Sequence, residues 1–358
     1  MGLGIVLHAA LPYVPNMPAE IWPTDDNSSS PIAWIFHFIH IWRMPLFFML
    51  SGFFASLLTG RNSWRYWWKN RLLRIALPLM VFSPLMSATL PSIFRYGITA
   101  DLTYFYSNEG QPYHLWFLWH LLIFVVFSFI YKSAGYICYR ILKVVHAGML
   151  LRAFYNIKSF VTRVVFQSKY PVILIGVFVL FNLATGGELI VNPIASGLYF
   201  YLGFSLYNDK TLLLFMRSHW KSYLCAGLVI FAGHQGVYSQ IDPFLPPHDP
   251  VWKIWGLPLV FLKVGAAVLL SFSLIGFVED KLGKFNSMTR YMSDASYWMY
   301  LVHLPIVTFI SFFMFNIKLP IELKFLLSVA ITVVACLVTY KYLVRNTLLG
   351  LMLNGRRY

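Results

Sequence analysis

Long apolar segments recur along the whole chain and are separated by polar or charged loops. A helix rises about 1.5 Å per residue, so about 20 apolar residues cross the roughly 30 Å hydrocarbon core of a bilayer. The pattern predicts an all-α, polytopic membrane bundle of about ten transmembrane helices. The first apolar segment gives only about 20 Å of helix, so we expect it to be incomplete at its N-terminus. The predicted spans are residues 1–13, 31–56, 75–94, 115–131, 171–184, 193–207, 223–238, 254–277, 296–315 and 323–343.

Composition also indicates a membrane protein. Hydrophobic residues make up 59% of the 358 residues and charged residues only 11%, which is too little polar surface for a soluble protein. The formal net charge of +15 does not indicate nucleic-acid binding, because the cations alternate between loops and do not cover one face. The three cysteines show neither a metal-binding spacing nor a disulfide pattern, and we expect no metal site.

The basic residues predict the orientation of the chain. With a cytoplasmic N-terminus, 22 of the 28 Lys and Arg residues fall on the inner side and 4 fall in outer loops, which is the positive-inside bias. Residues 132–169 form the longest inner segment, with seven cations and no acidic residue. This cytoplasmic segment is typical of an amphipathic helix on the anionic inner leaflet, with a solvated linker as the alternative. We treat residues 1–358 as one membrane domain.

Polar side chains inside the span 31–56 are candidates for function. At about 100° per residue, His40, Arg43 and Ser51 fall on one stripe of a helix. A cation at bilayer depth costs at least about 2.5–3.5 kcal/mol, so Arg43 should face the interior of the bundle and find partners there. The alternative is a structural arginine that ties helices together.

Two other apolar segments contain histidines. In the span 296–315, Tyr300 and His303 lie on one side of the predicted helix, and His303 would lie near the middle of the membrane. His8 lies alone in the apolar N-terminal segment, where a structural histidine is the alternative to a catalytic one.

His114 lies directly before the span 115–131 and Trp116 lies at its start, both at the outer interface. Tryptophan and histidine at this depth are typical of an aromatic belt, which explains them as well as a binding site does. Both residues stay candidates for contact with a substrate.

Five motifs follow one another along the chain: GIVLHAA, FIHIWRMPLFFMLSGFF, WWKNRLLRIALP, HLWFL and SDASYWMYLVH. Together they resemble the integral-membrane acyltransferase family 3, and within it the branch that succinylates glucans. The family fold, a ten-helix bundle with a cytoplasmic N-terminus, agrees with the predicted spans and charge bias. The resemblance implies a bacterial inner-membrane enzyme that moves an acyl group, here succinyl, from cytoplasmic acyl-CoA to a hydroxyl of a periplasmic or envelope glucan. It implies succinyl-CoA as co-substrate and no bound cofactor.

The resemblance also assigns roles to individual residues. His8 matches the family histidine, which implies a catalytic base. Arg71 and Arg74 match its paired arginines; three apart and so on one helix face, they would bind the phosphates of CoA, with anchoring at the inner interface as the alternative. Ser51 opens the matching SGF turn. The family arginine eleven positions before the histidine would precede Met1, which supports the expected incomplete start.

The implied chemistry needs a base and an oxyanion site. A sugar hydroxyl is too weakly acidic to attack a thioester unaided, and a neutral imidazole is suited to take its proton. Arg43 or His40 would stabilise the oxyanion of the tetrahedral intermediate. The expected substrate-binding residues are Ser51, His114, Trp116, Tyr300 and His303.

Two other functions stay open on the sequence alone. A proton-coupled transporter or flippase of an envelope glycan or its acyl precursor would also carry His and Arg within the membrane. Against it, no inverted repeat or pair of broken helices is evident in the sequence. A non-catalytic scaffold for glycan assembly is the weaker alternative, and the missing arginine keeps it open.

Overall fold

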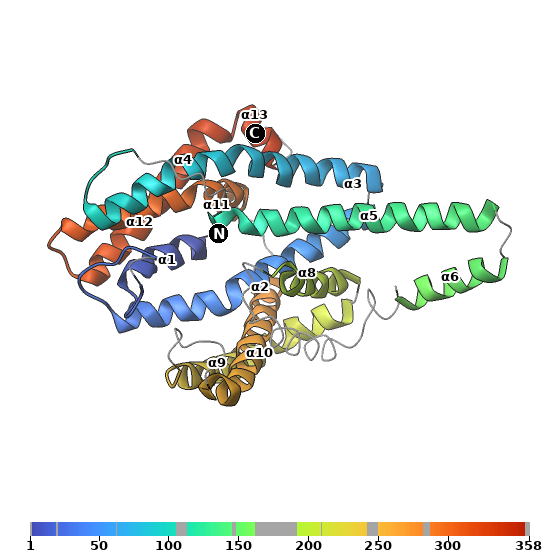
Figure 1. Cartoon of the computed structure of the whole chain (residues 1–358), viewed down its shortest axis with the longest axis horizontal. Helices are drawn as coiled ribbons and strands as arrows, with labels where there is room; N and C mark the ends of the chain where they lie inside the picture. The colour runs from blue at the N-terminus through green and yellow to red at the C-terminus, as the bar shows by residue number, and fades with distance from the viewer. Residues whose placement is uncertain are drawn as a thin grey trace. The chain divides into compact units, whose positions relative to one another are not determined.

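The computed structural model is helical throughout the residues that it describes (Figure 1). No strand occurs among these residues, which confirms the predicted all-α class. The described residues are 2–18, 21–61, 63–104, 113–144, 148–161, 192–208, 210–241, 250–281 and 287–354. The helices are α1 (Gly2–Ala10), α2 (Ser30–Arg61), α3 (Trp64–Arg71), α4 (Leu77–Thr99), α5 (Trp116–Val144), α6 (Gly148–Val161), α8 (Pro193–Asn208), α9 (Lys210–Tyr238), α10 (Pro250–Lys281), α11 (Ser287–Phe313), α12 (Ile321–Thr339) and α13 (Leu348–Asn354). The short 3₁₀ or π turns are η1 (Leu11–Tyr13), η2 (Leu72–Ala76), η3 (Tyr113–Leu115), η5 (Met314–Asn316) and η6 (Tyr340–Val344).

The chain folds into two compact units, and each is assembled from separate stretches of sequence. Unit 1 comprises Met1–His40, Leu72–Trp119 and Phe285–Tyr358, and unit 2 comprises Ile41–Arg71 and His120–Lys284. Two of the boundaries fall inside α2 and α5, which are continuous helices.

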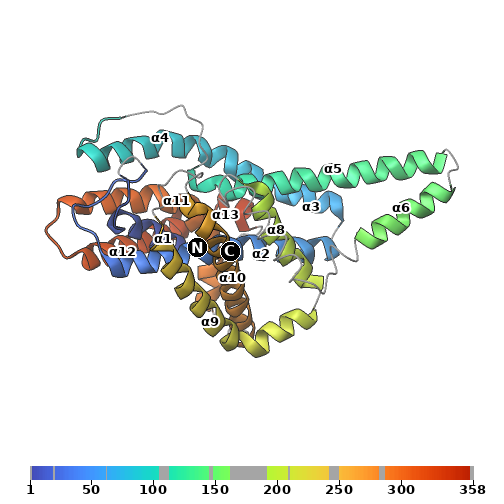
Figure 2. The same ribbon diagram turned by 60° about the horizontal axis from the view of Figure 1, so that its bottom comes forward.

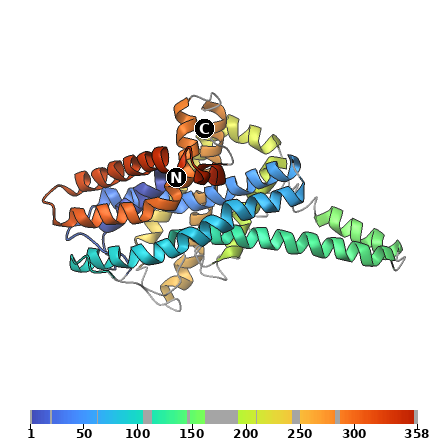
Figure 3. The same ribbon diagram turned by 90° about the horizontal axis from the view of Figure 1, so that it is seen from above.

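Helix α11 is the centre of unit 1. It packs against α1, α4 and α12, and its orange ribbon runs side by side with the red ribbon of α12 (Figure 3). Its buried positions include Leu301, Leu304, Thr308 and Phe312, whose spacing of three or four residues is expected for the packed face of a helix. Because α1 packs against both α11 and α12, the segment that carries His8 lies in the core of this unit.

In unit 2, two glycines let α2 and α8 cross closely. A Cβ atom on Gly52 would lie 1.7 Å from the backbone oxygen of Phe200, and one on Gly203 would lie 1.8 Å from that of Met49. No other residue fits at these distances, and small residues are typical of close crossings between membrane helices. The SGF sequence that begins at Ser51 is therefore a helical packing site inside α2, and the expected turn is wrong.

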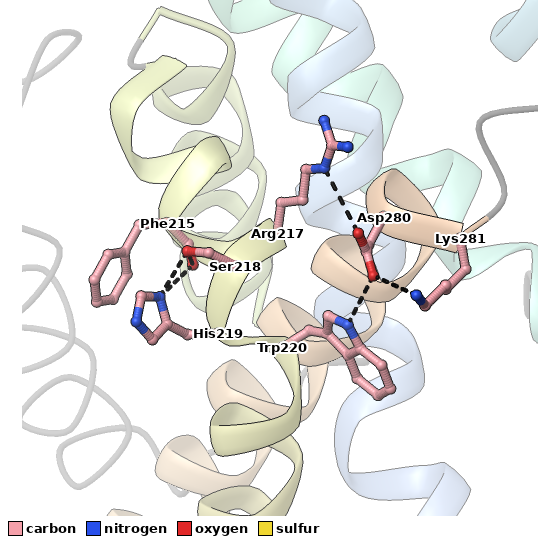
Figure 4. Close-up of polar contacts among 7 residues, drawn as sticks. All are labelled: Phe215, Arg217, Ser218, His219, Trp220, Asp280 and Lys281. Carbon is pink, nitrogen blue, oxygen red and sulfur yellow. Dashed lines mark hydrogen bonds and ion pairs between the residues drawn. The ribbon is translucent and has the colours of Figure 1, made fainter.

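Helices α9 and α10 form a close pair in unit 2 (Figure 2). The backbone of α9 leaves helical geometry at His219 (φ −117°, ψ 19°), where the helix is kinked. Beside this kink, Asp280 of α10 accepts a hydrogen bond from Nε1 of Trp220 (3.3 Å) and pairs with Arg217 (3.8 Å) and Lys281 (3.1 Å) (Figure 4). The carboxylate thus links residues on both sides of the kink to α10.

Most of the predicted spans correspond to helices. The predicted spans 193–207 and 223–238 lie in α8 and α9, and residues 2–13 form α1 and η1. The predicted span 171–184 lies outside the described residues, so the total of ten stays a prediction. Within the described residues, six helical segments are long and apolar enough to cross a membrane, namely Ser30–Thr59, Trp64–Thr99, Tyr113–Val144, Ile254–Lys281, Ser287–Asn316 and Ile321–Val344.

Several helices extend beyond the predicted spans, most of all α5, α9 and α11. Helix α5 continues to Val144 because no proline interrupts it, and α11 begins at Ser287. The basic segment therefore starts as helix, and α6 turns back along the end of α5, where Tyr155 packs against Tyr139 with ring centres 6.2 Å apart. Residues 148–161 of this segment are helical, and their position on the inner leaflet stays a prediction. Its exposed apolar side chains include Met149, Leu150, Ile157 and Phe160.

Candidate active site

Three histidines from distant parts of the chain meet inside unit 1. They are His8 on α1, His114 on η3 and His303 on α11, and we call them the histidine cluster. The ring centres of His8 and His303 are 5.4 Å apart, and those of His114 and His303 are 5.0 Å apart. His114 and His303 are buried and His8 is half-buried. The structure thus brings together three residues that the sequence indicated separately.

One backbone carbonyl binds two of these histidines. The oxygen of Tyr300 accepts hydrogen bonds from Nδ1 of His303 (2.8 Å) and from Nε2 of His114 (2.9 Å). A carbonyl oxygen only accepts, so both nitrogens carry a proton. A neutral imidazole has a single N–H, so the basic nitrogen is Nε2 in His303 and Nδ1 in His114.

Tyr300 also holds His114 through its side chain. Its hydroxyl donates a hydrogen bond to the backbone oxygen of His114 (2.8 Å). The two residues thus exchange bonds between side chain and backbone, which join η3 to α11 in the core of unit 1. A search of the described ranges finds no group of three or more His, Cys, Asp or Glu side chains that could hold a metal ion.

The indole of Trp22 covers His8 from the loop between η1 and α2. The two rings stack with their centres 5.8 Å apart and their planes at 18°. Phe94 and Phe312 contact the indole edge-on, with ring centres 5.0 Å and 6.3 Å away. The indole N–H is buried and has no acceptor among the described residues. Sequence reasoning missed Trp22, because a tryptophan in an outer loop indicates an interface anchor first.

A buried ion pair anchors this loop, residues 14–18 and 21–29, which we call the Trp22 strap. Nζ of Lys324 on α12 lies 2.7 Å from Oδ2 of Asp25, and the two side chains are 6% and 3% exposed. Lys324 also donates to the backbone oxygen of Phe315 (3.3 Å), and the hydroxyl of Ser29 donates to Glu322 (3.1 Å). The loop is therefore fixed to α12 by contacts that do not involve the histidine cluster.

The paired arginines lie at a change of helix type. Arg71 ends α3, Arg74 lies in the π turn η2, and both are half-buried. The guanidinium of Arg71 lies over the ring of Trp67, 6.0 Å from its centre, and the hydroxyl of Tyr297 donates a hydrogen bond to the backbone oxygen of Arg74. The helix face that Arg71 and Arg74 were predicted to share stays a prediction, because the two residues belong to different units.

The other predicted site residues do not belong to the histidine cluster. Arg43 is buried in α2, with 9% exposed, which confirms its predicted interior position. His40 is exposed and stacks on Phe36 with ring centres 5.3 Å apart, so it does not share the burial of Arg43. Ser51 is half-buried within α2, and Trp116 is half-buried at the start of α5. Arg43 and Ser51 belong to unit 2, and their joint role with the cluster stays a prediction.

Unit 2 holds a second buried histidine contact that the sequence did not indicate. Nδ1 of His120 lies 2.8 Å from Oγ of Ser196, which joins α5 to α8, and Phe48 stacks on the His120 ring. The Ser196 hydroxyl also donates to the backbone oxygen of Pro193 (3.1 Å). These contacts join α5 and α8 in the core of unit 2.

Curated relatives match part of the chain. The proteins named "Glucans biosynthesis protein C" of Salmonella typhi, Salmonella typhimurium and Salmonella paratyphi B are each 32% identical to it over 142 residues. The aligned region covers 36% of this chain and 35% of each relative, so the match spans about a third of their length. No solved structure matches the chain.

A family match covers nearly the whole chain. A family model described as an acyltransferase domain matches residues 2–341. This range includes the histidine cluster, the Trp22 strap and both paired arginines. The chain therefore belongs to the acyltransferase 3 family, and its apolar helices indicate a multi-pass membrane protein.

Proposed function

We propose that the protein transfers a succinyl group from cytoplasmic succinyl-CoA to a hydroxyl of a periplasmic or envelope glucan, at the bacterial inner membrane. Membership of the family supports acyl transfer, and the name of the Salmonella relatives supports a glucan as acceptor. The observation that carries the proposal is the contact between His8 and His303 in the core of unit 1. His8 matches the family motif, and this contact places it beside His303, whose basic nitrogen is Nε2.

His8 is the general base of the proposed reaction. It removes the proton of the glucan hydroxyl while the oxygen attacks the carbonyl carbon of the thioester. A C–O bond forms, the C–S bond breaks, and CoA leaves as a thiol after it receives the proton. A positioned base of this kind contributes about 10²–10⁴ to the rate.

The donor is bound by the arginines. The fork of a guanidinium matches the oxygens of a phosphate, so Arg71 and Arg74 bind the phosphates of CoA, and Trp67 supports Arg71. Arg43, with His40 as the alternative, donates to the oxyanion of the tetrahedral intermediate. One such donor in a site without water is worth about 3–4 kcal/mol of transition-state stabilisation.

The glucan reaches the site from the periplasmic side of the predicted topology, and acyl-CoA reaches it from the cytoplasmic side. Aromatic rings and fixed polar groups are the features by which proteins hold and orient small polar ligands. The proposed acceptor-binding residues are Ser51, His114, Trp116 and Tyr300.

The test is acyl transfer by the purified protein in liposomes, with labelled succinyl-CoA and a glucan acceptor. The wild type should label the glucan, and His8→Ala or His8→Asn should lower the rate about 10²-fold or more without loss of folded protein. The matched control is His234→Asn, which changes a buried histidine of α9 in unit 2. More than about a tenth of wild-type product from the His8 variants would contradict the base assignment. Glycan movement across the bilayer without acylation would instead favour a transporter.

A further inference from the structure

His303 is placed to receive a proton from His8. Its Nδ1–H is bound to the carbonyl oxygen of Tyr300 at 2.8 Å, which leaves Nε2 as the nitrogen that accepts a proton. The rings of His303 and His8 have their centres 5.4 Å apart and their planes at 45°. At this separation, nitrogens on facing edges come within reach of a hydrogen bond, directly or through one water.

The carbonyl of Tyr300 also prepares His303 to carry a positive charge. A buried cation is costly unless it is hydrogen-bonded, and His303 is only 4% exposed. When Nε2 gains a proton, the existing bond from Nδ1 becomes charge-assisted, and such bonds are roughly twice as strong as neutral ones. Turning the ring over would break this bond, so the tautomer and the orientation of His303 are fixed together.

We propose that His303 is the proton relay of His8. The inference rests on the proposed acyl transfer. The proton of the glucan hydroxyl passes to one nitrogen of His8, and the other nitrogen of His8 gives its proton to Nε2 of His303. The C–O bond forms, the C–S bond breaks, and the proton returns through His8 to the leaving sulfur. His303 is therefore a positioning residue that acts through His8, and this role replaces the substrate contact predicted for it.

The first test uses rates in mixtures of H₂O and D₂O. Two protons that move in one step give a curved dependence of rate on the deuterium fraction, and one proton gives a straight line. We expect a curve for the wild type and for His234→Asn. For His303→Asn we expect the rate to fall in a straight line with the deuterium fraction. Its maximal rate should be lower than that of the wild type by about tenfold or more, and its KM for succinyl-CoA should be unchanged. Asparagine keeps a short N–H donor for the Tyr300 carbonyl but has no basic nitrogen, so a merely structural role would leave the curve intact.

The second test does not depend on activity. In ¹⁵N spectra of histidine-labelled protein in detergent, His303 should be protonated at Nδ1 and not at Nε2, and His8→Asn should shift the Nε2 signal of His303. A straight line for the wild type, a proton on Nε2, or an Nε2 signal that His8→Asn leaves unchanged would each overturn the relay. If the wild type transfers no acyl group while the spectra show both expected features, the acyl-transfer proposal fails and the His8–His303 pairing stands.

Discussion

The buried pair of Asp25 and Lys324 should dominate the stability of the Trp22 strap. The charged atoms are 2.7 Å apart, and the side chains of Asp25 and Lys324 are 3% and 6% exposed, so water screens the charges little. Asp25→Asn would leave the Lys324 ammonium with its hydrogen bond to the Phe315 carbonyl, at 3.3 Å, and no opposite charge from Asp25. Removing one partner of a buried pair costs about 3–5 kcal/mol, because the other charge stays buried without compensation. We expect a loss of this size in the free energy of unfolding.

The assay is reversible unfolding in detergent, with Asp26→Asn as the matched control. Asp26 is the exposed neighbour of Asp25, and its change should stay within about 0.5 kcal/mol. Lys324→Met should be costly by itself, whereas Asp25→Asn combined with Lys324→Met should cost less than the two single changes together, by about 0.5–3 kcal/mol. If Asp25→Asn is as mild as Asp26→Asn, the pair does not hold the strap and the argument fails.

Two further predictions concern donor binding and topology. Changing both Arg71 and Arg74 to Gln should raise the KM for acyl-CoA with little change in the maximal rate, because phosphate contacts exist equally in ground and transition states; a collapsed rate with an unchanged KM would place them at the reacting atoms. In a cysteine-free background, Ser28→Cys should react with an impermeant maleimide added to intact cells after outer-membrane permeabilisation, and Ser159→Cys should not, because both positions are exposed but lie on opposite sides of the predicted topology. Labelling at position 159 and not at position 28 would show the opposite orientation. It would place Arg71 and Arg74 on the periplasmic side, where there is no CoA.

The helices were predictable because a membrane leaves the backbone little choice. Without water, every N–H and C=O group in the hydrocarbon must be paired within the segment, so a long apolar run implies a helix. The ends of α5 and α11 were not predictable in the same way. Hydropathy marks where a segment leaves the apolar layer, whereas a helix continues until its backbone is interrupted. This is why α5 continues through charged residues to Val144.

The individual residues of the candidate site could be predicted from the sequence, but their contact in the folded protein could not. The spacing of Tyr300 and His303 placed them on one helical face, and a motif resemblance identified His8. Nothing local in the sequence could show that His8 meets His303, because 295 positions separate them. The same holds for Lys324 and Asp25, which are 299 positions apart and pair only through the packing of the outer loop on α12.

Trp22 belongs to the strap and stacks on His8, so its indole N–H is placed to bind the glucan acceptor. A buried donor that has no acceptor in the described residues costs about 1–3 kcal/mol, and an acceptor on a bound glucan would remove this cost. A glucan hydroxyl that accepts this N–H would lie beside His8, where it loses its proton. Trp22→Phe keeps an aromatic ring against His8 but removes the donor. One neutral hydrogen bond contributes about 0.5–1.5 kcal/mol, so the KM for the glucan should rise about 2- to 10-fold while the KM for acyl-CoA stays unchanged. An unchanged KM for the glucan would mean that the strap closes the site without orienting the acceptor.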